Sequence, residues 1–280
     1  MEMKPRGTFL RSGKVKDIYE LDPEHLLFHF TDRVSAFDVV LPSTIPRKGE
    51  VLCKLSAFWF ETLGVPHHMV SVEGTNMMVV KKMAMIPVEC VVRGYLYGSL
   101  YERLTRGEVS LPVERVLASR LPAAYWDPTT KSEVKDEPIT DSEIVRQGRM
   151  STRELEEVRG STLSIYSKMS ERARQTGFIL ADLKLEFGRK DGRVILGDSI
   201  GPDEFRMWPA EKYSPGRSQD SYDKQPIRDW LTDSGYKKQL DTARKSGSLL
   251  PQPPALPPEL ISFVSGRYVQ IYEALAGRPI

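Results

Sequence analysis

Runs of β-forming residues separated by turn residues predict strands in the first part of the chain. Such residues occur between Val15 and Tyr19 and again from Leu26 to Phe30, on either side of the turn sequence Asp22-Pro23-Glu24. Two runs of this kind joined by turn residues are typical of a β-hairpin. We therefore predict an early hairpin with Gly13 at its entrance.

Apolar residues at helical spacing predict a helix after this hairpin. Leu52, Leu55, Trp59 and Leu63 recur three or four positions apart. This spacing places their side chains on one face of a helix, and Gly64 fits just past its end.

Two further helices are predicted by capping pairs, Thr140 with Glu143 and Ser151 with Glu154. A serine or threonine followed three residues later by glutamate satisfies free backbone groups at a helix start. We expect the second helix to end at Gly177. Its buried face should pack on the sheet that follows, with the residues Leu155, Val158, Thr162, Tyr166, Met169 and Ala173.

A proline-rich segment, "LLPQPPALPPEL", precedes the last predicted helix. We interpret it as a stiff connector rather than a polyproline ligand, because Pro258 suits the first turn of a helix. The apolar stripe of that helix is either a core face or an interface in a homo-oligomer, and it contains Leu260, Val264, Ile271 and Leu275.

The order of the predicted elements indicates an α+β fold. Strands come first, a mixed region follows, and helices and a late hairpin come last, without regular β-α alternation. The strand pattern that begins at Met77 is interrupted at Pro87 and resumes through Val92. We therefore predict a β-rich lobe over residues 1–86 and a larger α+β lobe over residues 87–280.

Composition and charge indicate a globular protein without a nucleic-acid or membrane partner. The 280 residues are 40% hydrophobic and 28% charged, and the net charge is +2. A charge this close to zero gives no basic surface for nucleic acid or anionic lipid, so any basic site is local. The first residues lack the apolar core of a signal peptide, and no apolar run reaches the roughly 18 residues of a membrane helix. A cytoplasmic location is expected.

Neither the cysteines nor the paired histidines show the spacing of a metal site. Cys53 and Cys90 lie in apolar surroundings, without a cysteine or histidine nearby at ligand spacing. We expect reduced thiols in a core. His67 and His68 have no third ligand close in the sequence and are interpreted as structural.

The stretch "GFILADLKLEFGRKDGRVILGDS" predicts a hairpin with one chemically active face. Asp182, Lys184 and Glu186 share one face of the first strand, because side chains alternate along a strand. A three-residue loop over Lys190-Asp191-Gly192 would place Asp198 opposite Lys184 and diagonal to Glu186. A two-residue loop would place Asp198 on the other face.

Two carboxylates beside a lysine suit a Mg²⁺ ion that is otherwise held by water and nucleotide phosphates. The alternative is a solvated strand face with an Asp-Gly turn. The apolar runs "GFILA" and "VILG" favour a buried hairpin instead.

Other charged residues fall in strings typical of phosphate binding. Lys14 and Lys16 alternate on a strand and would present two ammonium groups to phosphates. Solubilising lysines and ion pairs between lobes are the competing interpretations. The remaining strings contain Asp32, Arg33, Ser35 and Asp38, then Arg93 and Ser99, then Asp203 and Arg206, and finally Arg217, Lys224 and Arg228. The sequence has no Walker or dinucleotide motif.

Five of these strings together resemble one known family. "SGKVKDIYE", "TDRVSAFDVVLPSTIPRKGEVL", "IPVECVVRGYLYGSL", "ADLKLEFG" and "SQDSYDKQPIRDWL" occur in the order found in phosphoribosylaminoimidazole-succinocarboxamide synthases, or SAICAR synthetases, of purine biosynthesis. The resemblance covers about Ser12 to Leu231. It implies a two-lobed α+β fold related to ATP-grasp and kinase-like nucleotide folds, with the first lobe over ATP.

The resemblance also implies an activity. Such an enzyme uses ATP to join L-aspartate to the carboxylate of carboxyaminoimidazole ribonucleotide, and it releases ADP and phosphate. A carboxylate is a poor acyl donor, so ATP must activate it, and the protein's task is positioning and charge neutralisation. These small molecules are the expected partners, and ATP and Mg²⁺ the expected cofactors.

Site residues follow from the same resemblance. Glu186 and Asp198 would ligate Mg²⁺, and Lys184 and Asp182 would lie in the catalytic centre. The ATP-binding residues would be Gly13, Lys14, Lys16, Lys82, Met85 and Glu89. The substrate-binding residues would be Arg93, Ser99, Asp203 and Arg206, with Asp38, Lys131 and Arg228 as further polar contacts.

The loop after the second hairpin strand departs from the family pattern. Members usually have Asp-Glu there and then a Pro-Asp-Ser-Ser-Arg type of loop, whereas this chain has Asp198-Ser199 and then Glu204-Phe205 before Arg206. Phe205 is therefore a candidate to cover a different ring. The alternatives are a related enzyme that amidates another heteroaromatic carboxylate, a small-molecule kinase on a related fold, and a nucleotide-binding protein without catalysis.

Overall fold

The N-terminal part of the chain forms an antiparallel sheet. The computed structural model describes residues 4–131 and 136–280. The sheet has the order β1-β2-β3-β7-β6. Its strands are β1 (Thr8–Ser12), β2 (Lys16–Asp22), β3 (His25–Phe30), β6 (Met69–Glu73) and β7 (Met77–Lys81).

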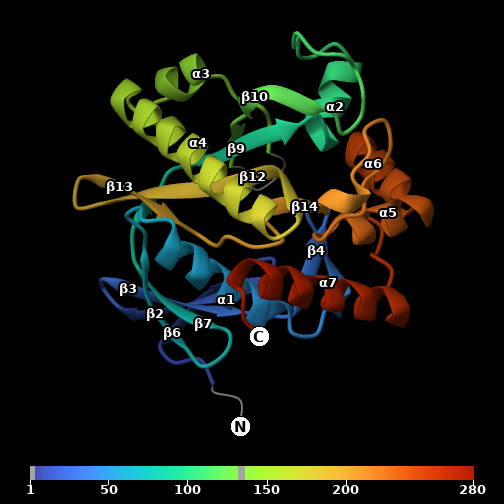
Figure 1. Ribbon diagram of the computed structural model, residues 1–280. Helices are drawn as coiled ribbons and strands as arrows, with labels where there is room; N and C mark the ends of the chain where they lie inside the picture. The colour runs from blue at the N-terminus through green and yellow to red at the C-terminus, as the bar shows by residue number, and fades with distance from the viewer. Residues whose placement is uncertain (1–3, 132–135) are drawn as a thin grey trace.

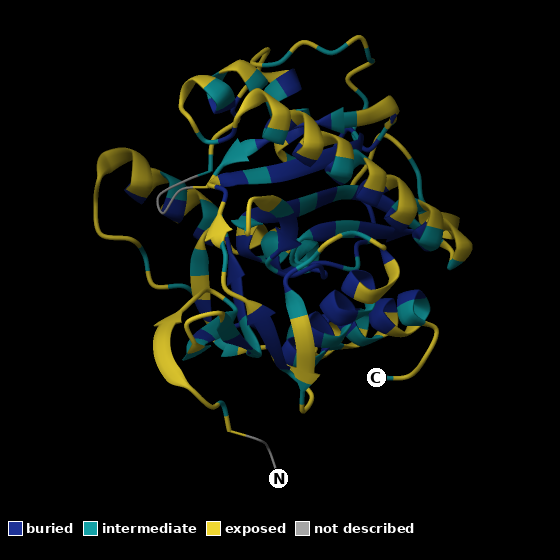
Figure 2. Cartoon of the chain, turned by 90° about the vertical axis from the view of Figure 1, so that its left-hand side faces the viewer, coloured by how far each residue is buried: buried dark blue, intermediate teal, exposed yellow. Residues whose placement is uncertain are grey.

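The predicted early hairpin is confirmed as β2 and β3, whereas β1 was not predicted. All five residues of β1 are exposed at the edge of the sheet (Figure 2), so no alternation of polar and apolar residues marks it. A second hairpin follows, with β4 (Arg33–Ala36) and β5 (Val39–Thr44) joined through Phe37 and Asp38, which both have positive φ.

The first helix, α1 (Lys48–Thr62), is confirmed with the predicted buried face. Gly64 follows it in the left-handed conformation that ends many helices. Cys53 on this helix and Cys90 are both free and buried, as predicted. Burial raises the pKa of the Cys53 thiol to about 12, so this thiol stays protonated.

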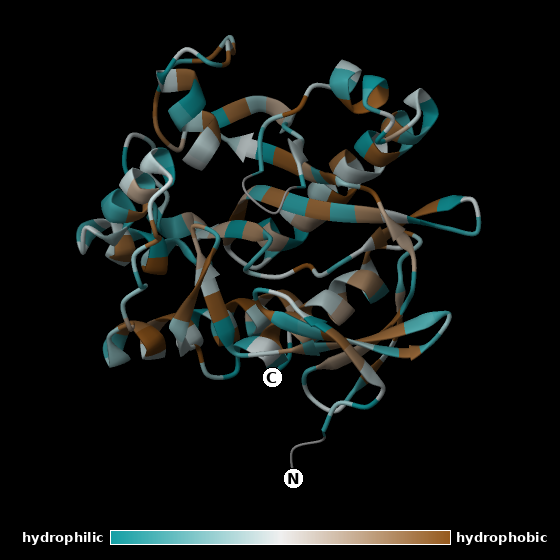
Figure 3. Cartoon of the chain, turned by 180° about the vertical axis from the view of Figure 1, so that it is seen from behind, coloured by the Kyte–Doolittle hydropathy of each residue, from teal (hydrophilic) through white to brown (hydrophobic). Residues whose placement is uncertain are grey.

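The second sheet is built around one long strand, β12 (Phe178–Lys190). β9 (Val88–Tyr95) and β14 (Phe205–Pro209) flank the first half of β12, and β8 (Ala84–Met85) and β13 (Arg193–Gly197) flank the second half. β10 (Arg120–Trp126) and β11 (Thr129–Thr130) pair with β9. Brown and teal segments alternate along the strands of both sheets in Figure 3, as expected for sheets with one apolar face.

The capping pairs are confirmed at α3 (Asp141–Arg146) and α4 (Thr152–Gln175), and both form complete capping boxes. All six residues predicted for the buried face of α4 are buried. The helix packs on β12, where the Tyr166 hydroxyl donates to the Leu180 carbonyl oxygen over 2.8 Å. The other helices are α2 (Gly98–Thr105), η1 (Ala210–Lys212), α5 (Gln225–Asp233), α6 (Tyr236–Ser246) and α7 (Pro258–Ala276).

The terminal helix α7 begins at Pro258 as predicted, and it packs on α1. Val264, Ile271 and Leu275 are buried, so this part of its apolar stripe is a core face. Figure 1 shows α7 beside α1 in the lower half, the long strands β9 and β12 above them, and α4 over the second sheet. The last helix thus returns to the N-terminal part of the molecule.

The arrangement confirms an α+β fold with antiparallel sheets and a C-terminal helix. Besides the two-stranded sheet of β4 and β5, one sheet is formed by strands between residues 8 and 81 and another by strands between residues 84 and 209. The division into lobes at residue 86 stays a prediction. Within the described residues, no helix has both the length and the apolar character needed to cross a membrane.

The predicted register of the late hairpin is wrong. Lys190 pairs with Arg193, so the loop contains only Asp191 and Gly192, both with positive φ. This two-residue geometry matches the twist of the strands and suits Asp-Gly. A continued β13 would therefore direct Asp198 to the apolar face. Instead β13 ends at Gly197, and Asp198 itself has a φ of 56°.

Candidate active site

The polar face of β12 carries a cluster of lysines and carboxylates. The Lys184 Nζ atom lies 2.9 Å from Glu186 Oε1 and 3.0 Å from Glu89 Oε1. Lys131 also forms an ion pair with Glu186, whose side chain is only 3% exposed. The predicted grouping of Asp182, Lys184 and Glu186 on one face is confirmed, because Leu183, Leu185 and Phe187 are in the core.

Asp198 joins this cluster from the end of β13. Its carboxylate pairs with Lys16 of β2, which also donates to the Ser199 hydroxyl over 3.1 Å. Burial alone would raise the pKa of Asp198, but the nearby ammonium groups of Lys16, Lys184 and Lys131 lower it well below its ordinary value. Two of these lysines contact Glu186, so the two carboxylates share one set of cations.

Lys184 is held in its charged form. Burial alone would lower the pKa of its ammonium group, but Glu186, Glu89 and Asp198 raise this pKa well above its ordinary value. A permanent positive charge therefore lies between the carboxylates, where it can face phosphoryl or carboxylate oxygens of a ligand.

A second cluster, rich in arginine, surrounds Asp182 on the same strand. Asp182 Oδ2 lies 2.5 Å from Arg206 Nη1 and 3.4 Å from Arg93 Nη1. Arg93 Nη2 donates to the Ser99 hydroxyl over 2.9 Å, at the start of α2. Two guanidinium groups, a hydroxyl and a helix N-terminus are groups that bind phosphate.

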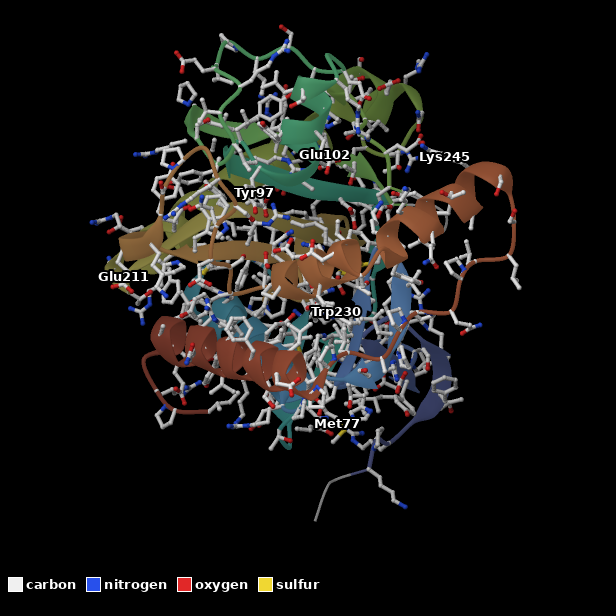
Figure 4. The ribbon with its side chains drawn as sticks, turned by 90° about the vertical axis from the view of Figure 1, so that its right-hand side faces the viewer. Met77, Tyr97, Glu102, Glu211, Trp230 and Lys245 are labelled. Atoms are coloured by element: carbon white, nitrogen blue, oxygen red, sulfur yellow. The ribbon has the colours of Figure 1, made fainter. Side chains whose placement is uncertain are left out.

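The arginine cluster is extended by residues that the sequence analysis did not identify. Asp127 accepts from Arg93 and from Arg103, each over 2.5 Å. Tyr97 lies with its ring centroid 5.0 Å from the Arg206 guanidinium, and Figure 4 shows Tyr97 between α2 and the strands below it. A single aspartate before proline reads as a turn residue, so no signal in the sequence distinguished Asp127.

Asp203 lies at the centre of a third, buried group. Its Oδ2 atom is 2.9 Å from Lys48 Nζ and 3.0 Å from Lys224 Nζ, and its Oδ1 atom accepts from the Tyr268 hydroxyl over 2.7 Å. Lys48 is 0% exposed and Asp203 is 3% exposed. The sequence analysis did not single out Lys48, which lies just before the first predicted helical pattern, or Tyr268, which lies within the last predicted helix.

The remaining predicted residues lie around these clusters. Lys14 pairs with Asp38, and Lys82 pairs with Glu20, at exposed positions. The Gly13 amide donates to the Lys16 carbonyl oxygen over 2.7 Å, which shapes the loop before β2. Of the last three residues, Met85 is exposed in β8, Glu89 belongs to the Lys184 cluster, and Arg228 lies in α5 near Asp223.

The carboxylates fit a hard cation that takes most of its ligands from elsewhere. Glu186 and Asp198 supply oxygen donors, which Mg²⁺ prefers. Among residues 4–131 and 136–280, no three histidine, cysteine or acidic side chains are grouped as a complete metal site. A Mg²⁺ held partly by phosphates and water needs no third protein ligand, so the donor set fits a nucleotide-bound ion.

Comparison with known proteins decides the family. A family model described as SAICAR synthetase matches residues 9–243. A phosphoribosylaminoimidazole-succinocarboxamide synthase of Nitrosopumilus maritimus is 50% identical over 274 residues, which are 97% of this chain and 99% of that protein. The chain belongs to the SAICAR synthetase family. A Corynebacterium efficiens protein of the same name is 41% identical over 96% of this chain and 91% of its own.

Solved SAICAR synthetases have the same fold. The Saccharomyces cerevisiae enzyme, complexed with SAICAR, aligns with a TM-score of 0.82 and 31% identity, over 97% of this chain and 95% of that chain. A type-2 SAICAR synthetase in complex with ADP aligns with a TM-score of 0.72 and 26% identity, over 96% and 98% of the two chains. The predicted family resemblance and fold are confirmed.

The loop that departs from the SAICAR synthetase pattern does not present an aromatic ring to a ligand. Phe205 is 3% exposed and belongs to the main hydrophobic core, so it does not cover a substrate ring as suggested. Glu204 turns inward as well, where it accepts from the Ser199 hydroxyl over 3.2 Å and from the Gly201 amide over 2.9 Å. Both side chains therefore point into the protein rather than toward a ligand.

Glu204 predicts a measurable pH dependence of stability. Burial, together with Asp203 and Asp198, raises the pKa of Glu204 to about 7. A carboxyl group whose pKa is higher in the folded than in the unfolded protein stabilises the fold while it is protonated. This stabilisation is complete below about pH 4.3, the pKa of glutamate in an unfolded chain, and it is lost as the pH rises through about 7. We expect Glu204→Gln to raise the melting temperature at pH 8 by a few degrees and to have less effect at pH 5.

The matched control for this prediction is Glu211→Gln, an exposed position in η1 (Figure 4). Thermal unfolding of both variants, measured by circular dichroism between pH 5 and pH 8, checks the prediction. A Glu204→Gln variant whose melting temperature follows the wild-type pH profile would contradict it.

Proposed function

We propose that this protein is an ATP-dependent ligase that joins L-aspartate to the carboxylate of carboxyaminoimidazole ribonucleotide in purine biosynthesis. One observation carries the proposal beyond family membership. A single strand, β12, presents the Lys184–Glu186 cluster and, two residues earlier, Asp182 with Arg93 and Arg206. A cation-binding group for a nucleotide and an anion-binding group for a second substrate are thus adjacent.

The ATP side of the proposal uses the loop before β2 and the connection between the sheets. Lys14 and Lys16 come from this loop and strand, and Lys16 reaches Asp198 across the site. Their ammonium groups suit ATP phosphates. Lys82, Met85 and Glu89 lie at the connection between the two sheets, and we propose that this connection holds adenine.

Mg²⁺ would be held by Glu186 and Asp198. When bound, it would supply positive charge to the phosphate oxygens of ATP. Lys131 is 45% exposed where it pairs with Glu186, so its long side chain is free to turn to solvent when a cation takes its place.

The second substrate would be oriented by the arginine cluster. Arg93, Ser99 and Arg206 would bind the ribonucleotide phosphate, and Asp182 fixes both guanidinium groups by ion pairs. We propose that Asp203, Lys224 and Arg228 complete the wall of the substrate site. Lys224 pairs with Asp203, and Arg228 lies near Asp223, which is also close to Arg206. We place Asp38 with Lys14 at the outer rim.

The chemistry requires positioning more than a protein nucleophile. The substrate carboxylate oxygen would attack the γ-phosphorus of ATP, and ADP would leave. The deprotonated aspartate amine would then attack the acyl carbon, and phosphate would leave. Lys184 would face the negative charge that develops in both steps, at a position fixed by Glu186 and Glu89.

A small-molecule kinase is the competing function for the same ATP site, and aspartate distinguishes the two. We expect ADP release in the presence of ATP and ribonucleotide to rise at least about tenfold when L-aspartate is added. The measurement is a coupled ADP assay at saturating ATP. ADP release that does not change when L-aspartate is added, together with a phosphorylated product detected by mass spectrometry, would indicate the kinase.

We also propose a cytoplasmic location, because ATP is supplied there and the free thiols of Cys53 and Cys90 stay reduced. A homo-oligomer stays a prediction that sedimentation or light scattering would test.

A further inference from the structure

The orientation of Asp198 depends on a local departure from strand geometry. Pairing in the hairpin stops at Glu186 and Gly197, and Asp198 follows with a φ of 56°. Aspartate tolerates this left-handed conformation better than most residues, but it is still uncommon, and neighbouring contacts favour it. Extended backbone at this position would point the carboxylate away from Lys184, since alternation would place it with Leu183 and Leu185.

His68 contacts the backbone of Asp198 directly. Its Nε2 atom lies 3.0 Å from the Asp198 carbonyl oxygen. A carbonyl oxygen only accepts, so Nε2 carries the proton and donates it. This hydrogen bond comes from the segment before β6 and crosses to the end of β13.

The His68 ring has little freedom to move. It is 1% exposed, and the rings of Phe28 and Phe60 contact it edge-on, with centroid distances of 5.6 and 5.3 Å. Its main chain is fixed too, because the His68 amide donates to the Leu196 carbonyl oxygen over 3.0 Å and the Lys81 amide donates to the His68 carbonyl oxygen over 2.8 Å.

From this geometry we infer that His68 is a positioning residue for the Asp198 carboxylate. By donating Nε2–H to the Asp198 carbonyl oxygen, it holds the left-handed turn that directs the carboxylate toward Lys16 and Lys184. The paired histidines are therefore not equivalent, since His67 stacks on Phe60 with a centroid distance of 5.2 Å and has no contact of this kind with Asp198. The inference rests on the proposed metal role of Asp198.

Binding of Mn²⁺ in the presence of ADP, followed by electron paramagnetic resonance, tests the inference without turnover. His68→Leu removes the donor, and we expect it to weaken Mn²⁺ binding about 10- to 100-fold, the usual effect of losing a partner that orients a metal ligand. His68→Gln carries an amide nitrogen near the place of Nε2 and should restore binding to within about threefold of wild type. His67→Leu is the matched control and should bind Mn²⁺ as wild type does.

If His68 only stabilised the fold, His68→Leu would lower the melting temperature but would not bind Mn²⁺ more weakly than His68→Gln and wild type. Equal Mn²⁺ affinity in folded His68→Leu and wild type would overturn the inference while leaving the metal role of Asp198 intact. A wild-type protein that does not bind Mn²⁺ with ADP would overturn both.

Nitrogen-15 NMR of histidine-labelled wild type provides a measurement that does not depend on the folding of any variant. We expect His68 to be neutral with its proton on Nε2. A proton on Nδ1 would contradict the inference, because Nε2 would then have no hydrogen to donate.

Discussion

Asp198→Asn is expected to lower kcat by about 10³-fold or more at saturating ATP and Mg²⁺, while the fold stays intact. Asparagine has nearly the same shape and tolerates the left-handed φ of 56° at this position. The substitution removes the negative charge that Lys16, Lys184 and Lys131 surround. Loss of a charged group at the reacting phosphates removes stabilisation of the transition state, which explains the size of the effect.

Asp191→Asn is the matched control for this prediction. Asp191 is also an aspartate with positive φ, at 52°, in the same hairpin, but it lies exposed in the loop between β12 and β13. Steady-state kinetics and circular dichroism of both variants measure the difference. An Asp198→Asn variant that keeps the activity of the Asp191→Asn control would rule out the proposed metal role of Asp198.

Arg206→Ala is expected to raise the KM for the ribonucleotide about 100-fold and to change the KM for ATP by less than about threefold. Truncating one partner of a buried charge pair has an effect of this order. Arg206 pairs with Asp182 at 2.5 Å and lies 3.4 Å from Asp223, in the cluster proposed to bind the second substrate. ATP would bind on the other side of Lys184, so its affinity should change little.

Two further variants separate substrate binding from stability. Arg206→Lys keeps a charge beside Asp182 but loses the planar pair of donors, so the ribonucleotide KM should rise less than in the alanine variant. Arg189→Ala removes another arginine ion pair, with Glu154 at 2.5 Å, at a position of β12 outside the arginine cluster. Equal changes in both KM values for Arg206→Ala would be inconsistent with a role toward the ribonucleotide alone.

Local signals in the sequence were sufficient to predict four of the helices, α1, α3, α4 and α7, whereas α2, α5 and α6 were not predicted. The capping box at Ser151 and Glu154 forms within four residues, and the buried face of α4 follows from spacing along one helix. Strand β1 was missed because every one of its residues is exposed, so its sequence lacks an alternating pattern. Its place is determined by pairing with β2, which is a contact between segments.

In the late hairpin, residue spacing predicted which side chains share a face of β12 but not the register between β12 and β13. Alternation correctly placed Asp182, Lys184 and Glu186 together, because it depends only on their own strand. An Asp-Gly sequence suits both a two-residue loop and a longer loop with glycine in the left-handed conformation, so the register was not determined by the sequence. Asp198 reaches the expected face through its own backbone conformation, which contacts with His68 stabilise.

Residues that join distant segments were beyond prediction. Lys48 and Tyr268 come from the first and last helices, and they meet at Asp203 only in the folded protein. In the sequence, Lys48 is one of several charged residues just before the first predicted helical pattern, and Tyr268 is one position of the last predicted helix. The family resemblance identified Asp203, but its partners depend on the packing of α7 on α1.

The most direct test of the proposed function is a substrate-omission experiment with the purified protein. Mg²⁺-ATP, L-aspartate and carboxyaminoimidazole ribonucleotide are supplied together and then with each omitted in turn, and ADP and product mass are followed. The proposed function predicts a succinocarboxamide product that requires all three substrates. ATP binding without this product in the complete mixture would contradict it.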